Sequence, residues 1–145
     1  MPNWCNNHLK ITVPSPELRE FLETHGLDFE AIVPLSCEEY DDEIATQTWG
    51  TKWKLDEWEA EQVAKELLEG MPYSACFRTA WSPPIEAIVA LSDQFPDDIF
   101  FLTYYELGFC FAGALTMHKG KVYGEEYNDE ENVMRIANLI GHEEE

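Results

Sequence analysis

The sequence predicts an α+β fold, in which an antiparallel sheet of about four to five strands carries helices packed on one face. Two observations lead to this fold class. Short segments with alternating apolar residues are typical of strands, and longer segments with apolar residues three and four positions apart are typical of helices. Several strand segments are joined by turns too short for a crossover, which favours antiparallel pairing. We expect residues 1–145 to form one domain, because a chain of this length buries a sizeable core.

The N-terminal part predicts a strand followed by a helix. The segment "NHLKITV" alternates apolar and polar residues and is typical of a half-buried strand. In "PSPELREFLETHG", Ser15 is suited to cap a helix and Gly26 to end it. Residues 37–46, "CEEYDDEIAT", are rich in acidic residues, and we expect them to form an exposed loop.

The middle of the chain predicts two helices around a strand. Apolar residues recur at helical spacing from residue 56 to 69. The segment 73–81, "YSACFRTAW", alternates as a strand does. A further helix follows over 82–95, with Ser82 as its expected cap.

The C-terminal part predicts three strands and a helix. "IFFLTYYE" is apolar on both faces, as a central strand should be. The turn Leu107-Gly108 leads to "FCFAGALTMH", and Lys119-Gly120 leads to "KVYGEEY". Residues 129–139 have the pattern of a last helix. Residues 73–126 thus contain the βαββ part of a ferredoxin-like arrangement. Seven side chains are expected in the core of the sheet: Leu9, Ile11, Phe77, Phe101, Leu102, Phe111 and Leu115.

The net charge of −20 comes from 29 acidic against nine basic residues. Such a field repels nucleic-acid phosphates and anionic membranes, so we expect neither direct nucleic-acid binding nor membrane association. No apolar run reaches the ~18 residues of a spanning helix, and the N-terminus has no signal-peptide pattern. We therefore expect a cytoplasmic location. Basic proteins are the favoured partners, although acidic surfaces often serve solubility alone.

The segment "QTWGTKWK" places an aromatic and locally basic patch among many acidic residues. One interpretation is a small aromatic core in which Lys52 lies over a ring. The other is a half-exposed aromatic surface around Trp49, Lys52 and Trp53, suited to a protein partner or a planar ligand. Trp81 ends a second aromatic segment, and we expect the two segments to meet.

Four motifs in the same order resemble a known family: "MPNWCNN-L-I", "WGTKW", "F-TAWSPP" and "YYELGFCFAG". The chain resembles the YubB-like family of unknown function, which is found on bacteriophages, plasmids and other mobile elements. The resemblance covers most of the chain, from Met1 to about Tyr127. It implies a ferredoxin-like C-terminal part, a mobile-element origin and a bacterial host, and it implies no reaction.

Metal and cofactor sites are not predicted. Cys5 with His8, and Cys110 with His118, are two half-pairs, whereas zinc needs four converging ligands. The four cysteines contain no CxxC motif, and we expect free thiols. The acidic segments 41–43 and 125–131 lack the spaced oxygen ligands of a calcium loop.

Catalytic motifs are absent from the sequence: it contains no GxSxG, no phosphate-binding loop and no HExxH. Glu106 follows two tyrosines at a strand end and is a weak candidate for a general base. A carboxylate at such a position more often accepts hydrogen bonds from a turn.

Three classes of function remain. The first is a non-enzymatic acidic protein that binds a basic host protein; one form of it is an inhibitor that imitates nucleic acid. The second is a small-ligand or nucleotide-handling enzyme around Trp49, Trp53, Trp81 and Glu106, and the third is an accessory protein with no ligand. For the first class the candidate partner-binding residues are Glu38, Glu39, Asp41, Asp42, Glu43, Trp49, Lys52, Trp53, Trp81, Glu125, Glu126, Asp129, Glu130 and Glu131. The oligomeric state stays open.

Overall fold

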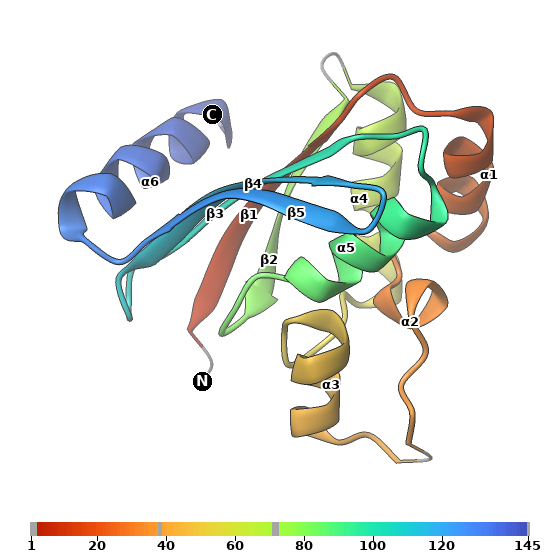
Figure 1. The fold of residues 1–145 in the computed structure, drawn as a ribbon, viewed down its shortest axis with the longest axis horizontal. Helices are drawn as coiled ribbons and strands as arrows, with labels where there is room; N and C mark the ends of the chain where they lie inside the picture. The colour runs from red at the N-terminus through yellow and green to blue at the C-terminus, as the bar shows by residue number, and fades with distance from the viewer. Residues whose placement is uncertain (1–2, 38, 71–72, 145) are drawn as a thin grey trace.

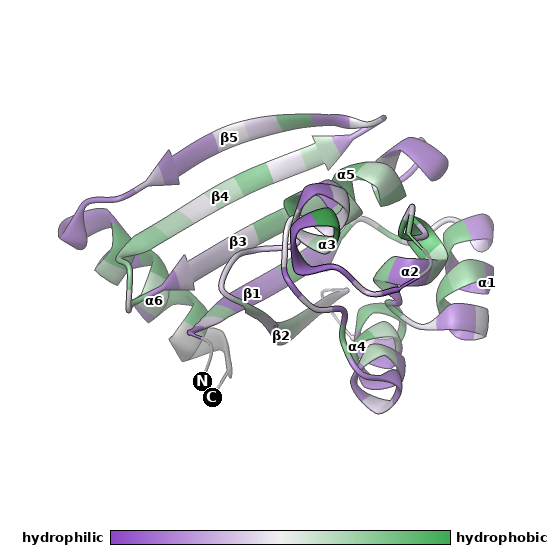
Figure 2. Cartoon of the chain, turned by 90° about the horizontal axis from the view of Figure 1, so that it is seen from below, coloured by the Kyte–Doolittle hydropathy of each residue, from purple (hydrophilic) through white to green (hydrophobic). Residues whose placement is uncertain are grey.

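A computed structural model describes residues 3–37, 39–70 and 73–144, the last four by their backbone alone. Over these residues the chain forms a five-stranded antiparallel sheet with the strand order β2-β1-β3-β4-β5 (Figures 1 and 2). The predicted α+β fold class is confirmed. The strands are β1 (Trp4–Ile11), β2 (Ser74–Ala80), β3 (Phe100–Glu106), β4 (Phe111–His118) and β5 (Lys121–Tyr127).

Helices cover both faces of this sheet, but unequally (Figure 1). The prediction that helices pack on one face holds for five of the described helices: α1 (Pro16–His25), α2 (Phe29–Ile32), α3 (Asp42–Trp49), α4 (Glu57–Glu69) and α5 (Ile85–Gln94). The exception is α6 (Glu130–Glu144), which crosses the opposite face. Its Val133, Ile136 and Ile140 form a second, small core with Ala112 of β4.

Side chains cap the starts of α1 to α4, whereas α5 has no such cap. Ser15 Oγ accepts a hydrogen bond from the N–H of Leu18 at 3.2 Å and caps α1, as predicted. Asp56 caps α4 in the same way. The prediction for α5 was wrong, because this helix begins after Pro84 without a side-chain cap. Ser82 instead donates to the carbonyl of Gly50.

The predicted acidic loop over residues 37–46 is helical in its second half. Asp41 caps α3 by accepting hydrogen bonds from the N–H groups of Glu43 and Ile44. Only Ala45 and Trp49 of this short helix are buried, so its apolar periodicity is too weak to stand out in the sequence. The carboxylates of its first turn also favour a helix start, because they lie at the positive end of the helix dipole.

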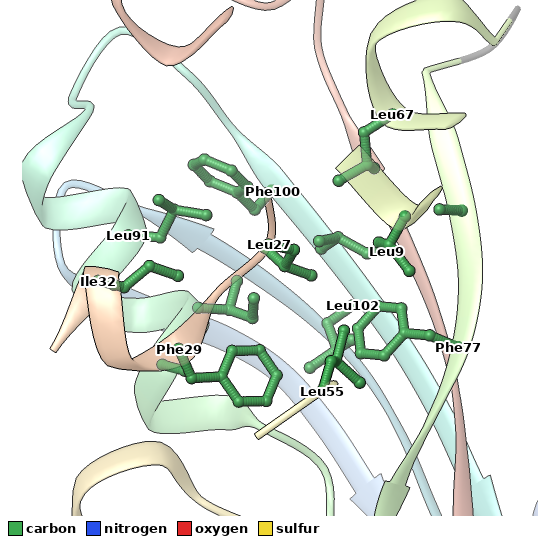
Figure 3. Packing of buried hydrophobic residues seen from close by; sticks show 14 of the residues in the cluster. Leu9, Leu27, Phe29, Ile32, Leu55, Leu67, Phe77, Leu91, Phe100 and Leu102 are labelled. Carbon is green, nitrogen blue, oxygen red and sulfur yellow. The ribbon is translucent and has the colours of Figure 1, made fainter. Parts of the chain in front are cut away.

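The main core lies between the sheet and α1–α5 (Figure 3). Among the predicted core residues, Leu9, Ile11, Phe77, Leu102 and Leu115 are buried there. Phe111 packs against this core and is half-buried. The prediction for Phe101 was wrong: its side chain is 36% exposed, since neighbouring residues of a strand point to opposite faces and Leu102 takes the core side.

Within the described ranges, no helix combines the length and the apolar character that crossing a membrane requires.

Leu102 and Phe101 offer a matched test of the face assignment in β3. Leu102→Ala should lower the free energy of unfolding by about 2–5 kcal/mol, because it leaves a cavity in the main core. Phe101→Ala should lower it by about 1 kcal/mol or less, because this ring is already partly in water. Urea unfolding of both variants measures the difference. Equal losses would contradict this face assignment, and a larger loss for Phe101→Ala would mean that the strand presents its faces the other way round.

Candidate functional site

The two tryptophan-containing segments meet at one hydrogen-bonded junction. Thr51 Oγ1 donates to the carbonyl of Ala80 at 2.7 Å, and Ser82 Oγ donates to the carbonyl of Gly50 at 2.6 Å. Thr79 Oγ1 donates to the carbonyl of Ser82 at 2.7 Å and closes the turn after β2. The end of α3 is therefore fixed against the end of β2.

Gly50 allows this close approach. It ends α3 in the left-handed region, with φ of +89°. A Cβ atom at this position would lie 2.8 Å from the nitrogen of Ile85 and 2.9 Å from the carbonyl oxygen of Pro83. Both are backbone atoms, so a larger residue would push the junction apart.

Trp81 occupies a backbone conformation that bulky residues rarely adopt, with φ of +71°. The N–H of Ser82 donates to the carbonyl of Ala80 at 2.9 Å across it, which makes a strained γ-turn. The N–H of Trp81 itself donates to the carbonyl of Asn3 at 2.8 Å. These bonds hold the indole at the surface, where it is 37% exposed.

Four aromatic side chains, Trp4, Trp53, Trp81 and Phe109, gather at this end of the sheet, and we call them the aromatic end. The rings of Trp4 and Trp53 lie 6.2 Å apart, and those of Trp81 and Phe109 lie 6.1 Å apart. Each of the four is more than a third exposed. Aromatic side chains exposed in a group are typical of a surface that binds another molecule.

Two cationic side chains already lie on these rings. The Nζ atom of Lys52 is 5.2 Å from the ring centroid of Trp53. The guanidinium carbon of Arg78 is 5.3 Å from that of Trp4. Both distances fall within the range of a cation–π interaction, so the rings of Trp4 and Trp53 each interact with a cationic side chain.

Trp49 does not belong to this surface, and its assignment as a partner-binding residue was wrong. Only 2% of it is exposed, and its Nε1–H donates to the carbonyl of Val33 at 2.9 Å. Its ring packs against Phe29 in the main core. Trp49 and Trp53 lie on opposite sides of the Gly50 turn, which is why one is buried and the other is not.

A shallow pocket of about 460 Å³ opens beside Trp81. It is lined by Asp42, Glu43, Thr46, Lys52, Trp81 and Ser82. The Nζ atom of Lys52 lies 3.3 Å from a carboxylate oxygen of Asp42. The pocket therefore joins the acidic first turn of α3 to the aromatic end.

Tyr40 braces the same region from outside the pocket. Its hydroxyl donates a hydrogen bond to the carbonyl of Lys52. Partial burial and the nearby carboxylates of Asp42 and Asp41 raise the pKa of Tyr40 to about 12. The hydroxyl therefore keeps its proton, and its hydrogen bond, well into the alkaline range.

The remaining acidic candidates have different places. Glu39 and Asp41 are exposed beside α3, whereas Glu38 lies outside the described residues. The second acidic group, over residues 125–131, belongs to β5 and the start of α6, and Figures 1 and 2 draw it well away from α3. The two groups therefore do not form one surface.

Several acids of the second group have local partners. Tyr104 Oη donates to Glu126 at 2.6 Å, and Tyr127 Oη donates to Glu125 at 2.7 Å. Hydrogen bonds from Asn132 hold the pKa of Asp129 below its usual range. Glu130 and Glu131 lie in the first turn of α6, where negative charge stabilises a helix. These local contacts account for the acidic residues over 125–131 without a protein partner.

Glu106 is a turn residue, as the alternative interpretation of the sequence held. It is only 3% exposed, and its two carboxylate oxygens accept hydrogen bonds from the N–H groups of Gly108 and Phe109, at 2.6 and 2.7 Å. It does not line the pocket beside Trp81. Its contribution to the site is to fix the β3–β4 turn that presents Phe109.

The cysteine–histidine pairs do not converge. Cys5 and His8 are three positions apart on β1, so Cys5 points into the main core and His8 to the opposite face. Cys110 lies in the β3–β4 turn, while His118 contacts the carbonyl of Pro96 at the far end of β4. None of the four cysteines forms a disulfide, and within the described ranges no three His, Cys, Asp or Glu residues are grouped as metal ligands.

A larger groove, of about 780 Å³, lies between α1 and α4. Its rim carries both signs of charge, among them Arg19, Glu23, Glu61 and Lys65. None of the predicted site residues lines it, and no exposed tryptophan reaches it. The aromatic end, where exposed rings and charge coincide, is therefore the stronger candidate site.

The sequence interpretation missed Trp4, Arg78 and Phe109. Trp4 and Phe109 lie inside the quoted motifs "NWCNN" and "ELGFCF"; Trp4 begins β1, and Phe109 lies in the turn between β3 and β4. The signal in the sequence that could have identified them was a bulky aromatic residue beside a turn. Their grouping depends on the sheet, in which Trp4 of β1 pairs with Ala80 and the β3–β4 turn lies nearby.

Comparison with known families gives one match. Residues 48–144 match the family described as "Ferredoxin-like domain in Api92-like protein", which is more than half of the chain. This match agrees with the α+β fold. No curated protein and no solved structure shows significant similarity to the chain.

Gly50 and Gly120 test whether the junction needs a glycine for space as well as for conformation. Both have positive φ, but the Cβ of an alanine at position 120 would meet the exposed side chain of Asp93 instead of backbone. Gly120→Ala should therefore cost only the left-handed strain, about 1–2 kcal/mol. Gly50→Ala should lower the free energy of unfolding by more. Equal costs in urea unfolding would show that the junction tolerates a side chain.

Cys5 should be the least reactive thiol of the chain. Burial, and after it the carboxylate of Glu106, raise the pKa of Cys5, so little thiolate forms. Iodoacetamide at pH 8 should label the partly exposed Cys37 in the folded protein and Cys5 only after the protein is unfolded in urea. Mass spectrometry of the labelled peptides measures both. Equal labelling of Cys5 and Cys37 in the folded protein would contradict the buried position of β1.

Proposed function

We propose that this chain, which belongs to the family of Api92-like proteins with a ferredoxin-like domain, functions in binding rather than in catalysis. Its aromatic end docks against a basic surface of another protein. The family description names a fold and no reaction. The observation that carries the proposal is the grouping of three exposed tryptophans and Phe109 next to the acidic first turn of α3.

The chemistry of the site favours a cationic partner. Lys52 lies between the carboxylate of Asp42 and the ring of Trp53, and Arg78 lies on the ring of Trp4. A lysine or arginine of a partner would meet the same two kinds of group. The net charge of −20 adds a long-range attraction that speeds the encounter with a basic surface.

Aromatic anchors supply what charge alone does not. Exposed ion pairs contribute little to affinity, whereas buried tryptophans at the centre of an interface often contribute most of it. Trp81 and Phe109 are held by the strained turn and by Glu106, so little conformational entropy is lost when a partner covers them. The aromatic end is thus prepared for binding before a partner arrives.

The nature of the partner is the further part of the proposal. The resemblance of four sequence motifs to the YubB-like family supports a mobile element as the source of the protein and the cytoplasm of a bacterial host as its location. A basic surface in such a host is often one that binds nucleic acid. The protein would then inhibit a host defence or replication protein by occupying its nucleic-acid-binding surface.

The small-ligand enzyme receives no support from the site geometry. Its four expected residues do not surround one pocket, because Trp49 is in the core and both oxygens of Glu106 are bound by a turn. A binding role does not require any of these four residues to be chemically reactive.

A pull-down from a bacterial host lysate, followed by kinetic measurements on the captured partner, tests the proposal. Binding should weaken from 0.1 to 1 M salt, since the Debye length falls from ~10 to ~3 Å. Replacing Glu39, Asp41, Asp42 and Glu43 by amides should slow association. Asn at position 41 still caps α3, so the fold is preserved.

Trp81→Ala should speed dissociation about tenfold or more, because it removes a central aromatic anchor. Tyr123→Ala is the control, since Tyr123 is an exposed aromatic residue on β5, at the other edge of the sheet. A partner whose affinity ignores salt, the amide variant and Trp81→Ala would refute the proposal and leave the acidity as a solubilising surface.

A further inference from the structure

We infer that the pocket beside Trp81 binds one arginine side chain of the partner, in a place that Lys52 occupies in the unbound protein. The inference rests on the proposed function and names the chemical group that the site recognises. Four observations carry it: the hydrogen-bonding state of the pocket wall, its two carboxylates, the exposed ring of Trp81 and the position of Lys52.

The hydroxyl groups of the pocket wall have already used their protons. Thr46 Oγ1 donates to the carbonyl of Asp42 at 2.9 Å. Ser82 Oγ donates to the carbonyl of Gly50 at 2.6 Å. Each hydroxyl has one proton, so towards a ligand both oxygens act only as acceptors.

The carboxylates add further acceptors. Asp42 and Glu43 both line the pocket, and no described residue forms an ion pair with Glu43. Apart from Lys52, the wall therefore offers acceptors and negative charge. A suitable ligand group brings several donors, a positive charge and no acceptor, and guanidinium has five such N–H donors.

The ring of Trp81 selects for a flat cation. Its indole is 37% exposed and forms part of the wall. A planar guanidinium stacks on an aromatic face while its edge pairs with carboxylates, whereas an ammonium group meets the wall as a point charge. Arginine therefore fits this pocket better than lysine does.

Lys52 is a weak substitute for that ligand. It reaches Asp42 at 3.3 Å, and its side chain is still 32% exposed. It follows the Gly50–Thr51 junction directly, so its backbone is fixed while its long side chain can swing out. Binding of an arginine then means that one cation replaces another. Until the complex forms, Lys52 remains the partner of the Asp42 carboxylate.

The test uses the full chain and three short peptides, acetyl-Gly-X-Gly-amide with X as arginine, lysine or citrulline. Citrulline has the shape of arginine without its charge. Indole N–H signals in ¹⁵N-resolved NMR spectra report binding. The arginine peptide should shift the signal of Trp81, with the citrulline peptide binding at least about tenfold more weakly and the lysine peptide in between.

Three variants sharpen the test. Asp42→Asn should weaken the arginine peptide about tenfold, whereas Asp97→Asn, which makes the same charge change in the loop before β3, should leave its affinity unchanged. Lys52→Met should strengthen binding several-fold, because it removes the competing cation. If Lys52→Met weakens binding, or if arginine and citrulline bind alike, the inference is wrong.

The two proposals fail in different ways. If a host partner depends on Trp81 but the arginine peptide does not shift the Trp81 signal, the arginine pocket is refuted and the docking surface stands. If the peptide binds as expected while the partner ignores Trp81→Ala, the docking surface is refuted and the pocket stands.

Discussion

A short series of buried and partly buried hydrogen bonds holds the site together. Asn7 lies wholly inside the sheet, and its side-chain N–H donates to Thr79 Oγ1 at 2.9 Å. The Thr79 hydroxyl in turn donates a hydrogen bond to the carbonyl of Ser82, and the Ser82 hydroxyl donates one to the carbonyl of Gly50. Each member satisfies the next in a region of low dielectric, so loss of one leaves another unpaired. The position of α3 against the end of β2, and with it the aromatic end, follows from this series of hydrogen bonds.

Rigidity of the backbone explains why the exposed rings do not collapse onto the protein. Trp81 is held in its γ-turn by hydrogen bonds on both sides, and Phe109 is held by the carboxylate of Glu106. A turn of this kind is costly, and it persists because the junction around it admits no other arrangement. The energy that offsets this cost comes from packing elsewhere, including the main core, in which the rings of Trp49 and Phe29 are in contact. The same tryptophan-rich segment thus supplies one ring for stability and another for the surface.

The sequence contained enough to predict the fold class, the strands and most helix starts, because these depend on local periodicity and capping. Ser15 and Asp56 acted as their residue types predict. The site was harder, because it depends on which residues the sheet register brings together. Nothing local distinguishes Trp49, which is buried, from Trp53, which is 39% exposed. Likewise Ser82 had the sequence of a cap, and only the distant carbonyl of Gly50 decides its real partner. The helix α3 was missed although Asp41, Ala45 and Gly50 have the spacing of a cap, a buried position and a helix end.

The place of β1 in the sheet has a consequence for how the chain is made. Of the five strands described, β1 is synthesised first, yet both of its neighbours come much later: Asn7 contacts Phe77, 70 residues away, and β3 begins only at Phe100. The N-terminal strand therefore emerges with its apolar face exposed and has no sheet to join until translation is well advanced. Long loops must close before these pairings stabilise anything, which slows folding. During synthesis, the many carboxylates add a like-charge repulsion that opposes contact between nascent chains.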